Sequence, residues 1–293
     1  DRIVTVTLRM LANPEGPLAA ESDVLTARVF AERHPGCFRT TRNIVGMRGR
    51  CPRPISGQGA TVTDSDYDDF AEAYARQNET GLFNAYYEQP AMLRLAGDVR
   101  GRRILDVGCG SGPTIAKLRE AGADVSGFDR SAGMIGFARE RLGQHVDLRV
   151  ADLADPLPYA DAEFDDAIAS LVLHYLEDWA GPLTELRRVL KPGGRLLVSV
   201  NHPVIFPVVY PDSDYFAITK YTEDYDFAGH KVWLTFFHRP LHTMTDSFSA
   251  AGFRITSISE PPPAPDTPIE LLPDGLEPGK SFLCFLFFLL EAN

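Results

Sequence analysis

Hydrophobic and polar positions follow two alternating patterns through the middle of the chain. Short runs of apolar and β-branched residues, such as "RRILDVGC" and "GRLLVSV", predict buried strands. Between such runs, segments such as "GPTIAKLREAG" and "SAGMIGFARERLG" carry apolar residues at helical spacing, which indicates amphipathic helices. Strands that alternate with helices predict a parallel sheet covered by helices on both faces. The expected fold is therefore α/β, a Rossmann-like three-layer sandwich.

Two parts of the chain depart from this alternation. Residues 1–60 contain many arginines and no lysine, and they end in a turn-rich segment, so we treat them as an N-terminal extension of unknown role. Residues 61–293 form the expected main domain, with N-terminal helices before the first strand. Within it, residues 201–240 contain ten aromatic residues and a turn-like "FAGHK" between two strand-like arms. We predict that this insert is a lid over a pocket, with core packing and a dimer contact as alternatives.

Composition and charge exclude several classes of protein. The net charge is −11, whereas nucleic-acid binding requires a dense basic patch. The four cysteines form no CxxC pair, so we expect no metal site and reduced thiols. The longest apolar run, "FLCFLFFLL", is far shorter than the roughly 20 residues that cross a bilayer, and no secretory leader is visible. These features predict a soluble cytoplasmic protein without nucleic-acid or membrane partners, and leave open whether it is a homo-oligomer.

The stretch "ILDVGCGSG" places glycines at the end of the first buried strand. A glycine-rich turn from strand to helix lets a ligand lie against the backbone and the free N–H groups of the helix. Gly108, Gly110 and Gly112 have the spacing GxGxG, and Pro113 stands where the NAD fingerprint GxGxxG has its last glycine. The carboxylate of Asp106 would repel a pyrophosphate and favour a cationic ligand. This loop therefore indicates a nucleotide-like ligand that carries a positive charge.

Two further acids end the next two predicted strands. Asp129 in "GFDRS" follows the glycine loop by about twenty residues, where a carboxylate can bind a ribose diol. Asp152 in "VADL" could accept a hydrogen bond from an exocyclic amine. Open α/β sheets bind ligands at the carboxyl ends of their strands, so all three acids should meet at one edge. Each acid taken alone has a helix cap as its alternative role.

With these residues in place, the chain resembles the class I S-adenosylmethionine-dependent methyltransferases, and more narrowly their small-molecule branch. The resemblance covers about residues 62–293. It rests on five segments in order: "LDVGCGSG", "GFDRSAGMI", "ADLADPLP", "FDDAIASLVLHYL" and "ELRRVLKPGGRLLVSV". It implies S-adenosylmethionine as the cofactor and a seven-stranded, mostly parallel sheet. The last strand, expected at 281–290, would be antiparallel and inserted beside its neighbour.

The resemblance also implies a role for individual residues around the cofactor. Asp106, Gly108 and Gly110 would hold the methionine part, with Asp106 near its ammonium group. Asp129 would bind the ribose hydroxyls, and Asp152 would bind the adenine amine. Five further positions complete the expected pocket: Met134 and the backbone of Leu153 at the adenine, Leu171 at the sulfonium, and Tyr67 with Tyr74 closing over the cofactor.

The expected reaction is transfer of a methyl group to an O, N or C atom of a small, aromatic or apolar metabolite. His174 and His238 are the candidate general bases, and a structural role is the alternative for each. The residues expected to bind the substrate are His202, Tyr215, Trp233, Phe237 and Arg239. A non-methylation reaction on the same fold remains the main alternative function, because fold and cofactor do not determine the chemistry. A nucleic-acid methyltransferase is disfavoured by the acidic composition and by the lack of a Pro-Pro-aromatic motif after the fourth strand.

Overall fold

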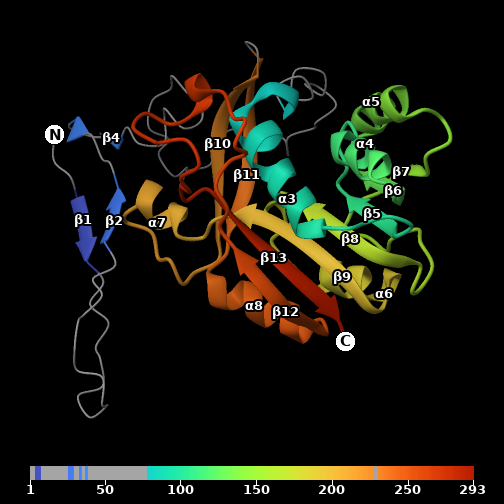
Figure 1. Cartoon of the computed structure of the whole chain (residues 1–293). Coiled ribbons are helices and arrows are strands. Elements are labelled where there is room, and N and C mark those ends of the chain that lie inside the picture. Colours follow the sequence, from blue (N-terminus) through green and yellow to red (C-terminus); the bar gives the residue numbers. More distant parts are fainter. Residues whose placement is uncertain (1–3, 8–25, 30–32, 35–36, 39–77, 228–229) are drawn as a thin grey trace, which may run out of the picture. The chain divides into compact units, whose positions relative to one another are not determined.

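The computed structural model describes residues 4–7, 26–29, 33–34, 37–38, 78–227 and 230–293 (Figure 1). The chain divides into two units, Asp1–Arg53 and Pro54–Asn293. The described part of the first unit consists of two antiparallel strand pairs. In these pairs β1 (Val4–Thr7) joins β2 (Thr26–Val29), and β3 (Arg33–His34) joins β4 (Cys37–Phe38).

A seven-stranded sheet forms the centre of the second unit (Figure 1). Its strands in chain order are β5 (Arg103–Val107), β6 (Asp124–Asp129), β7 (Leu148–Val150), β8 (Phe164–Ser170), β9 (Leu190–Asn201), β12 (Phe253–Ser259) and β13 (Phe285–Ala292). Their order in space is β12-β13-β9-β8-β5-β6-β7. Strand β13 runs antiparallel to both neighbours, β9 and β12, whereas the other pairs are parallel. The predicted fold is confirmed, and the inserted last strand begins four residues later than expected.

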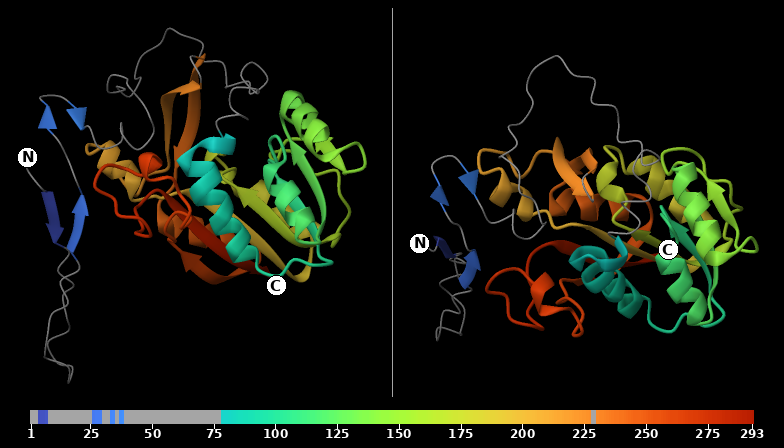
Figure 2. Two further views of the ribbon diagram at one scale, coloured as in Figure 1. Left: turned by 45° about the horizontal axis from the view of Figure 1, so that its top comes forward. Right: turned by 90° about the horizontal axis from the view of Figure 1, so that it is seen from above.

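Helices cover the sheet on both faces (Figure 2). Each face has its own core of buried side chains. The helices on one face are η2 (Leu82–Glu88), α3 (Gln89–Ala96), α4 (Pro113–Glu120) and α5 (Ala132–Leu142). Those on the other face are α6 (Ala180–Val189) and α8 (Leu241–Ala250). Alternation along β5 sends Leu105 and Val107 into the second core, whereas Ile104 enters the first. By the same period, Asp106 lies on the face covered by η2 and α3.

The insert between β9 and α8 forms a short helix and a hairpin. It contains α7 (Ile205–Val209), followed by β10 (Thr219–Phe227) and β11 (His230–His238) in an antiparallel pair. The predicted strand arms are therefore confirmed. Two single turns, η3 (Leu173–Tyr175) and η4 (Ile269–Leu271), complete the described elements. Within the described ranges, every helix is too short or too polar to cross a membrane.

Candidate functional site

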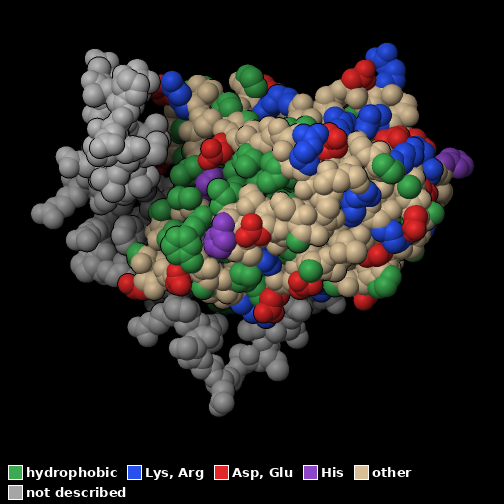
Figure 3. Space-filling view, turned by 90° about the horizontal axis from the view of Figure 1, so that it is seen from below, with side chains coloured by type: hydrophobic (Ala, Val, Ile, Leu, Met, Phe, Trp, Pro, Cys, Tyr) green, Lys and Arg blue, Asp and Glu red, His purple; other side chains and the backbone are tan. Residues whose placement is uncertain are grey.

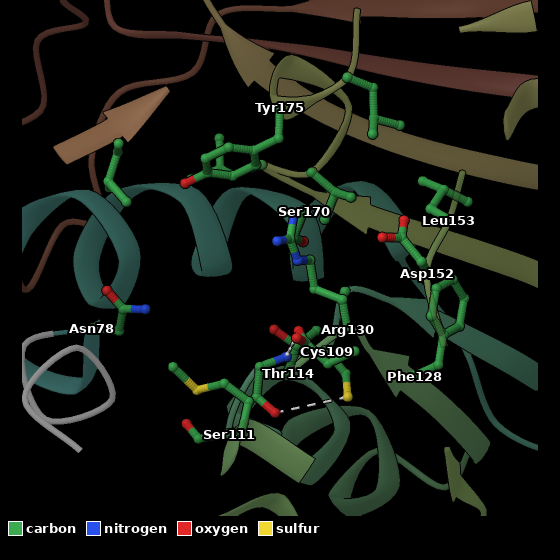
Figure 4. A pocket seen from close by; sticks show the side chains of 18 of the residues that line it. Asn78, Cys109, Ser111, Thr114, Phe128, Arg130, Asp152, Leu153, Ser170 and Tyr175 are labelled. Atoms are coloured by element: carbon green, nitrogen blue, oxygen red, sulfur yellow. Dashed lines mark hydrogen bonds between the residues drawn. The ribbon is translucent and has the colours of Figure 1, made fainter. Parts of the chain in front are cut away.

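A cavity of about 520 Å³ lies at the carboxyl ends of the central strands. Its wall contains the glycine loop after β5, Asp129 at the end of β6, Asp152 after β7, and Leu171 after β8. The hairpin β10–β11 adds a further part of the wall. Figure 4 shows Asp152, Leu153 and Phe128 on one side of this cavity, with Tyr175 and Ser170 on another. The fold thus joins segments that are distant in sequence at the sheet edge where α/β proteins bind ligands.

The backbone of the glycine loop explains why glycine stands at two of its positions. Gly108 and Gly110 have φ values of 66° and 53°, in the left-handed region that favours glycine. A Cβ atom on Gly108 would lie 2.6 Å from Cγ2 of Val172, so a side chain is excluded there. A Cβ atom on Gly110 would meet nothing within 4 Å, and Gly110 belongs to the cavity wall. The space beside Gly110 is therefore available to a ligand.

Replacing Gly110 with alanine is expected to weaken S-adenosylhomocysteine binding at least about tenfold, because the methyl group would occupy ligand space. Gly101 is a matched control, since it also has a positive φ (73°) and nothing within 4 Å of a Cβ atom, yet lies outside the cavity. Both alanines should cost about 1–2 kcal/mol of backbone strain. Isothermal titration calorimetry should show weaker binding for Gly110→Ala and unchanged binding for Gly101→Ala. Equal dissociation constants would contradict this assignment of the loop.

Asp129 is positioned by backbone donors on both sides of the loop. Its Oδ2 accepts a hydrogen bond from the backbone N–H of Gly110 at 2.9 Å, and its Oδ1 accepts from that of Ser131 at 2.9 Å. Ser131 in turn caps α5, because its hydroxyl accepts from the backbone N–H of Met134 at 3.0 Å. These contacts hold Asp129 and Met134 at the cavity wall, where the sequence analysis expected a ribose and an adenine to bind.

Asp152 and Leu153 lie at the far end of the cavity, after the edge strand β7. The Oδ1 atom of Asp152 accepts a hydrogen bond from the backbone N–H of Ala154 at 2.9 Å, and Leu153 is buried. Asp152 and Asp129 therefore follow neighbouring strands in the order that the sequence predicted. The structure brings the predicted residues Gly108, Gly110, Asp129, Met134, Asp152, Leu153 and Leu171 into one cavity wall.

Asp106 lies beneath the loop and is 2% exposed. Its Oδ2 atom is buried without a hydrogen-bond partner. Burial raises the pKa of this carboxyl group to about 8, and the negative charges of Glu88 and Asp129 add to the rise. Among the described residues, no positively charged side chain opposes this shift of the pKa. A buried carboxyl group with one unpartnered oxygen fits a cationic ligand group such as the ammonium of S-adenosylmethionine.

Glu88 is a cavity residue that the sequence analysis missed. It lies at the end of the π-helical segment η2, is 4% exposed, and belongs to the cavity wall. Burial raises the pKa of this carboxyl group to about 7, although hydroxyl groups of Ser199 and Ser170 oppose the rise. Ser199 lies 111 positions further along the chain, so no local sequence pattern connects the two residues. In the sequence, Pro90 is the residue that marks this segment, because it directly follows the π-helical turn and Gln89.

The two predicted bases lie outside the described wall of the cavity. His174 is buried in η3, where its Nδ1 accepts from the backbone N–H of Asn201 at 3.3 Å and its ring packs against Phe236. Burial lowers the pKa of His174 to about 3, so the ring is neutral. His238 is stacked on Phe206, with ring centroids 4.3 Å apart, and its Nε2 lies 2.8 Å from the carbonyl of Tyr215. The prediction of His174 as a general base is not supported by its position, because η3 turns its ring into the packing against Phe236 and away from the described cavity wall.

Of the five residues expected to bind the substrate, Phe237 lines the cavity. His202 lies 2.7 Å from Oε1 of Glu260, and the hydroxyl of Tyr215 accepts from the backbone N–H of Leu241 at 3.2 Å. Both residues contribute to the packing of the insert and lie outside the described wall. Trp233 also lies outside it and is 48% exposed.

Arg239 is buried but turned away from the cavity wall. Its guanidinium lies over the ring of Trp179, 4.6 Å from the centroid, and donates to the carbonyl of Glu177. It therefore fixes the segment between η3 and α6. The predicted residues Tyr67 and Tyr74 lie outside the described part of the chain. Among the described residues, no group of three or more His, Cys, Asp or Glu side chains could hold a metal ion.

The sequence and the fold were compared with known proteins. The family model described as a methyltransferase domain matches residues 105–198. A demethylmenaquinone methyltransferase of Clavibacter sepedonicus is 37% identical over 135 residues, which are 45% of this chain and 55% of that protein. A malonyl-[acyl-carrier protein] O-methyltransferase of Serratia marcescens is 36% identical over 108 residues, or 37% of this chain and 42% of that protein. The chain thus spans about half the length of these curated relatives.

A solved structure shows that the fold is shared more widely than these sequence matches. The putative S-adenosylmethionine-dependent methyltransferase of Listeria monocytogenes has a TM-score of 0.57 and 24% identity, over 70% of this chain and 96% of that chain. Together, the sheet order, the glycine loop and its acids define an α/β domain of the kind that binds nucleoside cofactors. Residues 105–198 thus match a methyltransferase domain, and the second unit has the fold of a solved S-adenosylmethionine-dependent methyltransferase.

Proposed function

We propose that this protein transfers the methyl group of S-adenosylmethionine to an O, N or C atom of a small, apolar or aromatic metabolite. The observation that carries the proposal is a single cavity with two chemically different ends. The polar end contains the glycine loop, Asp129 and Asp152, which suit the cofactor. The other end is lined mainly by apolar side chains that suit an apolar acceptor, although Lys220, Thr235 and Glu177 also belong to it; the apolar residues are Leu171, Val172, Tyr175, Leu176, Leu234 and Phe237.

S-adenosylmethionine supplies an activated methyl group on a positively charged sulfur, so the main task of the protein is alignment. Asp106 would neutralise the ammonium group, while Asp129 would accept from the ribose hydroxyls. Asp152 and the backbone of Leu153 would hold the adenine. Orientation of two reactants in this way can supply about 7–11 kcal/mol of the barrier reduction. The hairpin β10–β11 would exclude water from the reacting atoms by covering the apolar end.

The hairpin presents two different faces because side chains alternate along its strands. Tyr221 and Phe236 point to one face and pack with Tyr175 and Leu234. On the other face, Lys220 and Phe237 are cross-strand partners that line the cavity. Leu234, which points to the same face as Phe236, also belongs to the cavity wall, so residues from both faces of the hairpin border the cavity. Phe237 is the aromatic side chain that the hairpin contributes to this wall and would touch the acceptor, which supports the predicted lid.

A small-molecule acceptor also agrees with the surface and with the relatives. On the face shown in Figure 3, basic and acidic side chains are interspersed and form no continuous basic patch of the kind that binds nucleic acid. The two relatives described above are named for different acceptors, demethylmenaquinone and malonyl-[acyl-carrier protein]. The insert at residues 201–240 lies outside the matched family model, so the acceptor has to be identified by experiment.

The proposal is tested by incubation with S-adenosyl-[methyl-¹⁴C]methionine and a panel of acceptors. A suitable panel contains 1,4-dihydroxynaphthalene kept reduced under nitrogen, catechol, tryptamine and a metabolite extract. We expect label in a small molecule and an equal amount of S-adenosylhomocysteine. Turnover of S-adenosylmethionine without label in any product would favour a non-methylation reaction. Absence of any turnover would contradict the proposed function.

Replacing Phe237 with alanine is expected to raise the KM for 1,4-dihydroxynaphthalene at least about tenfold, because the acceptor loses apolar contact area. The dissociation constant of S-adenosylhomocysteine should stay the same, since Phe237 lies at the acceptor end. Phe216→Ala is the control, because Phe216 belongs to the same insert but is 71% exposed and outside the cavity wall. Steady-state kinetics and calorimetry check both variants. Equal KM values for the two variants would contradict the assignment of the cavity-facing side of the hairpin.

A further inference from the structure

Glu88 has no role in the site as described so far, although its carboxyl group is buried in the cavity wall. We propose that Glu88 is the general base that removes the proton from the methyl acceptor. This inference rests on the proposed function and adds a catalytic residue to it.

The order of the strands indicates which end of the cavity Glu88 occupies. Reading from β7 across the sheet, the cavity acids are Asp152 after β7 and Asp129 at the end of β6, followed by the glycine loop after β5. The next two strands in the sheet, β8 and β9, would lie beyond the methionine part of a cofactor bound in this direction. Glu88 accepts a hydrogen bond from Ser199 of β9, on the side of the glycine loop that is opposite to Asp129 and Asp152. It therefore faces the end of the cavity where methyl group and acceptor meet.

Ser199 fixes the direction of the Glu88 carboxyl group. The Oγ atom of Ser199 accepts a hydrogen bond from the backbone N–H of Leu171 at 3.0 Å. Its own hydrogen is then donated to Oε1 of Glu88 at 2.6 Å. Leu171 has a φ of 52°, a backbone conformation that is uncommon for a residue with a side chain. A strained residue, a hydroxyl group and a carboxyl group thus form one chain of hydrogen bonds at the cavity wall.

The helix that carries Glu88 is shaped by Pro90. Proline has no N–H group, so the carbonyl of Tyr86 cannot accept the usual helical hydrogen bond from residue 90. That carbonyl instead accepts from the backbone N–H of Ala264 at 2.6 Å. The helix is π-helical up to Glu88 and α-helical after it. This local widening, frequent at functional sites, is what places the Glu88 side chain between β8 and β9.

The other described carboxyl and thiol groups in the cavity wall are less suited to be the base. Both oxygens of Asp129 accept backbone hydrogen bonds, and Asp152 lies at the opposite end of the cavity. Burial raises the pKa of the Cys109 thiol well above its usual value, and Glu177 is exposed at the rim. The histidines predicted as bases, His174 and His238, lie outside the described wall.

The chemical step is balanced with Glu88 as the proton acceptor. The acceptor's nucleophilic O or N atom forms a bond to the methyl carbon, while the bond from that carbon to sulfur breaks and leaves its electron pair on sulfur. The proton of the acceptor moves to the carboxylate of Glu88 and then to solvent. The groups that face Glu88 are Asp106 from β5, Ser170 from β8 and Ser199 from β9. The pKa of about 7 that burial gives to Glu88 suits a base at neutral pH.

The test compares Glu88→Gln with the wild type, using 1,4-dihydroxynaphthalene as the acceptor and S-adenosylhomocysteine as the binding probe. We expect kcat to fall about 100-fold or more, whereas the dissociation constant of S-adenosylhomocysteine stays within about threefold. The wild-type kcat should fall on the acidic side of an apparent pKa near 7, and this limb should vanish in Glu88→Gln. Glu120→Gln, an exposed position on α4, is the control and should keep the wild-type kcat and pH profile.

Ser199→Ala adds a readout that a merely structural role would not change. Its hydroxyl group lowers the pKa of Glu88, so its loss should move the acidic limb to higher pH. Wild-type turnover by Glu88→Gln would overturn the base assignment while leaving the proposed function intact. An unchanged kcat with much weaker S-adenosylhomocysteine binding would overturn it in favour of a cofactor-binding role. If the wild type methylates no acceptor, the proposed function and the base assignment fall together.

A measurement without any acceptor completes the test. Carbon-13 NMR of glutamate-labelled protein saturated with S-adenosylhomocysteine should show one carboxyl signal, absent in Glu88→Gln, that titrates near pH 7. A Glu88 signal that titrates below pH 5 would overturn the assignment, because such a weak base gains little at neutral pH.

Discussion

Replacing Asp106 with asparagine is expected to weaken S-adenosylhomocysteine binding about 100-fold while making the ligand-free protein more stable above neutral pH. The carboxyl group is buried, its Oδ2 atom has no partner, and no described cationic side chain compensates it. The ligand's ammonium group would supply that charge. Loss of a buried charge pair typically costs about 3 kcal/mol or more, which corresponds to about two orders of magnitude in affinity.

The stability effect follows from the direction of the pKa shift. The folded-state pKa of Asp106 is raised to about 8, above its unfolded value near 4, so ionisation opposes folding. This cost is absent below about pH 4, grows as the pH rises, and is complete above about pH 8. Asparagine carries no charge and avoids it, so we expect Asp106→Asn to be more stable by about 2 kcal/mol or more at pH 8.

Two measurements check this prediction. Calorimetric titration with S-adenosylhomocysteine gives the affinity, and thermal unfolding of the ligand-free protein at pH 5 and pH 8 gives the stability. The difference in Tm between variant and wild type should be small at pH 5 and clearly positive at pH 8. A variant that binds S-adenosylhomocysteine as tightly as the wild type would contradict the placement of the ammonium group at Asp106.

The second large effect is expected at Asp166, where replacement by asparagine should destabilise the protein by about 3 kcal/mol or more. Asp166 is 1% exposed and lies near the start of β8, whereas the cavity lies at the carboxyl end of that strand. Arg195 of β9 holds both of its oxygens at 2.7 Å, and Arg102 contacts it from the start of β5. Arg195 also donates to the carbonyl of Ala96 at 3.0 Å, which ties α3 to the sheet. Asparagine would leave two guanidinium groups without their shared carboxylate.

Thermal unfolding should show a Tm about 10 °C lower for Asp166→Asn. The control is Asp124→Asn, which removes an exposed ion pair with Arg103 at 3.7 Å and should change stability by less than about 0.5 kcal/mol. The arginines lower the folded-state pKa of Asp166 below its unfolded value. Its stabilisation is therefore present above about pH 4 and lost as the pH falls towards the folded-state pKa. Equal stability of Asp166→Asn and wild type would contradict the role of this cluster.

The sequence contains enough information for the sheet and for the polar end of the cavity. The periodicity of the apolar residues distinguishes strands from helices, because each element buries its apolar face at its own spacing. The alternation of these elements along the chain then determines the fold class. The glycine loop, Asp129 and Asp152 follow consecutive strands, so the parallel sheet brings them to one edge. These positions are predictable because local backbone geometry alone determines where they lie.

The apolar end could not be predicted in the same way. Glu88 reaches the cavity through a π-helical turn and a hydrogen bond to Ser199, 111 positions away. His174 follows β8 directly, but η3 turns its ring against Tyr175 and Phe236. In the hairpin, Phe237 lines the cavity while Phe236 packs on the other face, a difference of one residue in register. Whether these side chains point into the cavity or into the core depends on tertiary packing, which no single segment of the sequence determines.

A crystal structure of the protein with S-adenosylhomocysteine would test the central claim most directly, namely that one cavity aligns the cofactor with an acceptor under the hairpin. We predict the adenine beside Asp152, the ribose hydroxyls on Asp129 and the ammonium group beside Asp106. The sulfur atom should face the space between Glu88 and Phe237. A ligand bound in the reverse direction, or with its sulfur atom closed off from the hairpin, would contradict the claim.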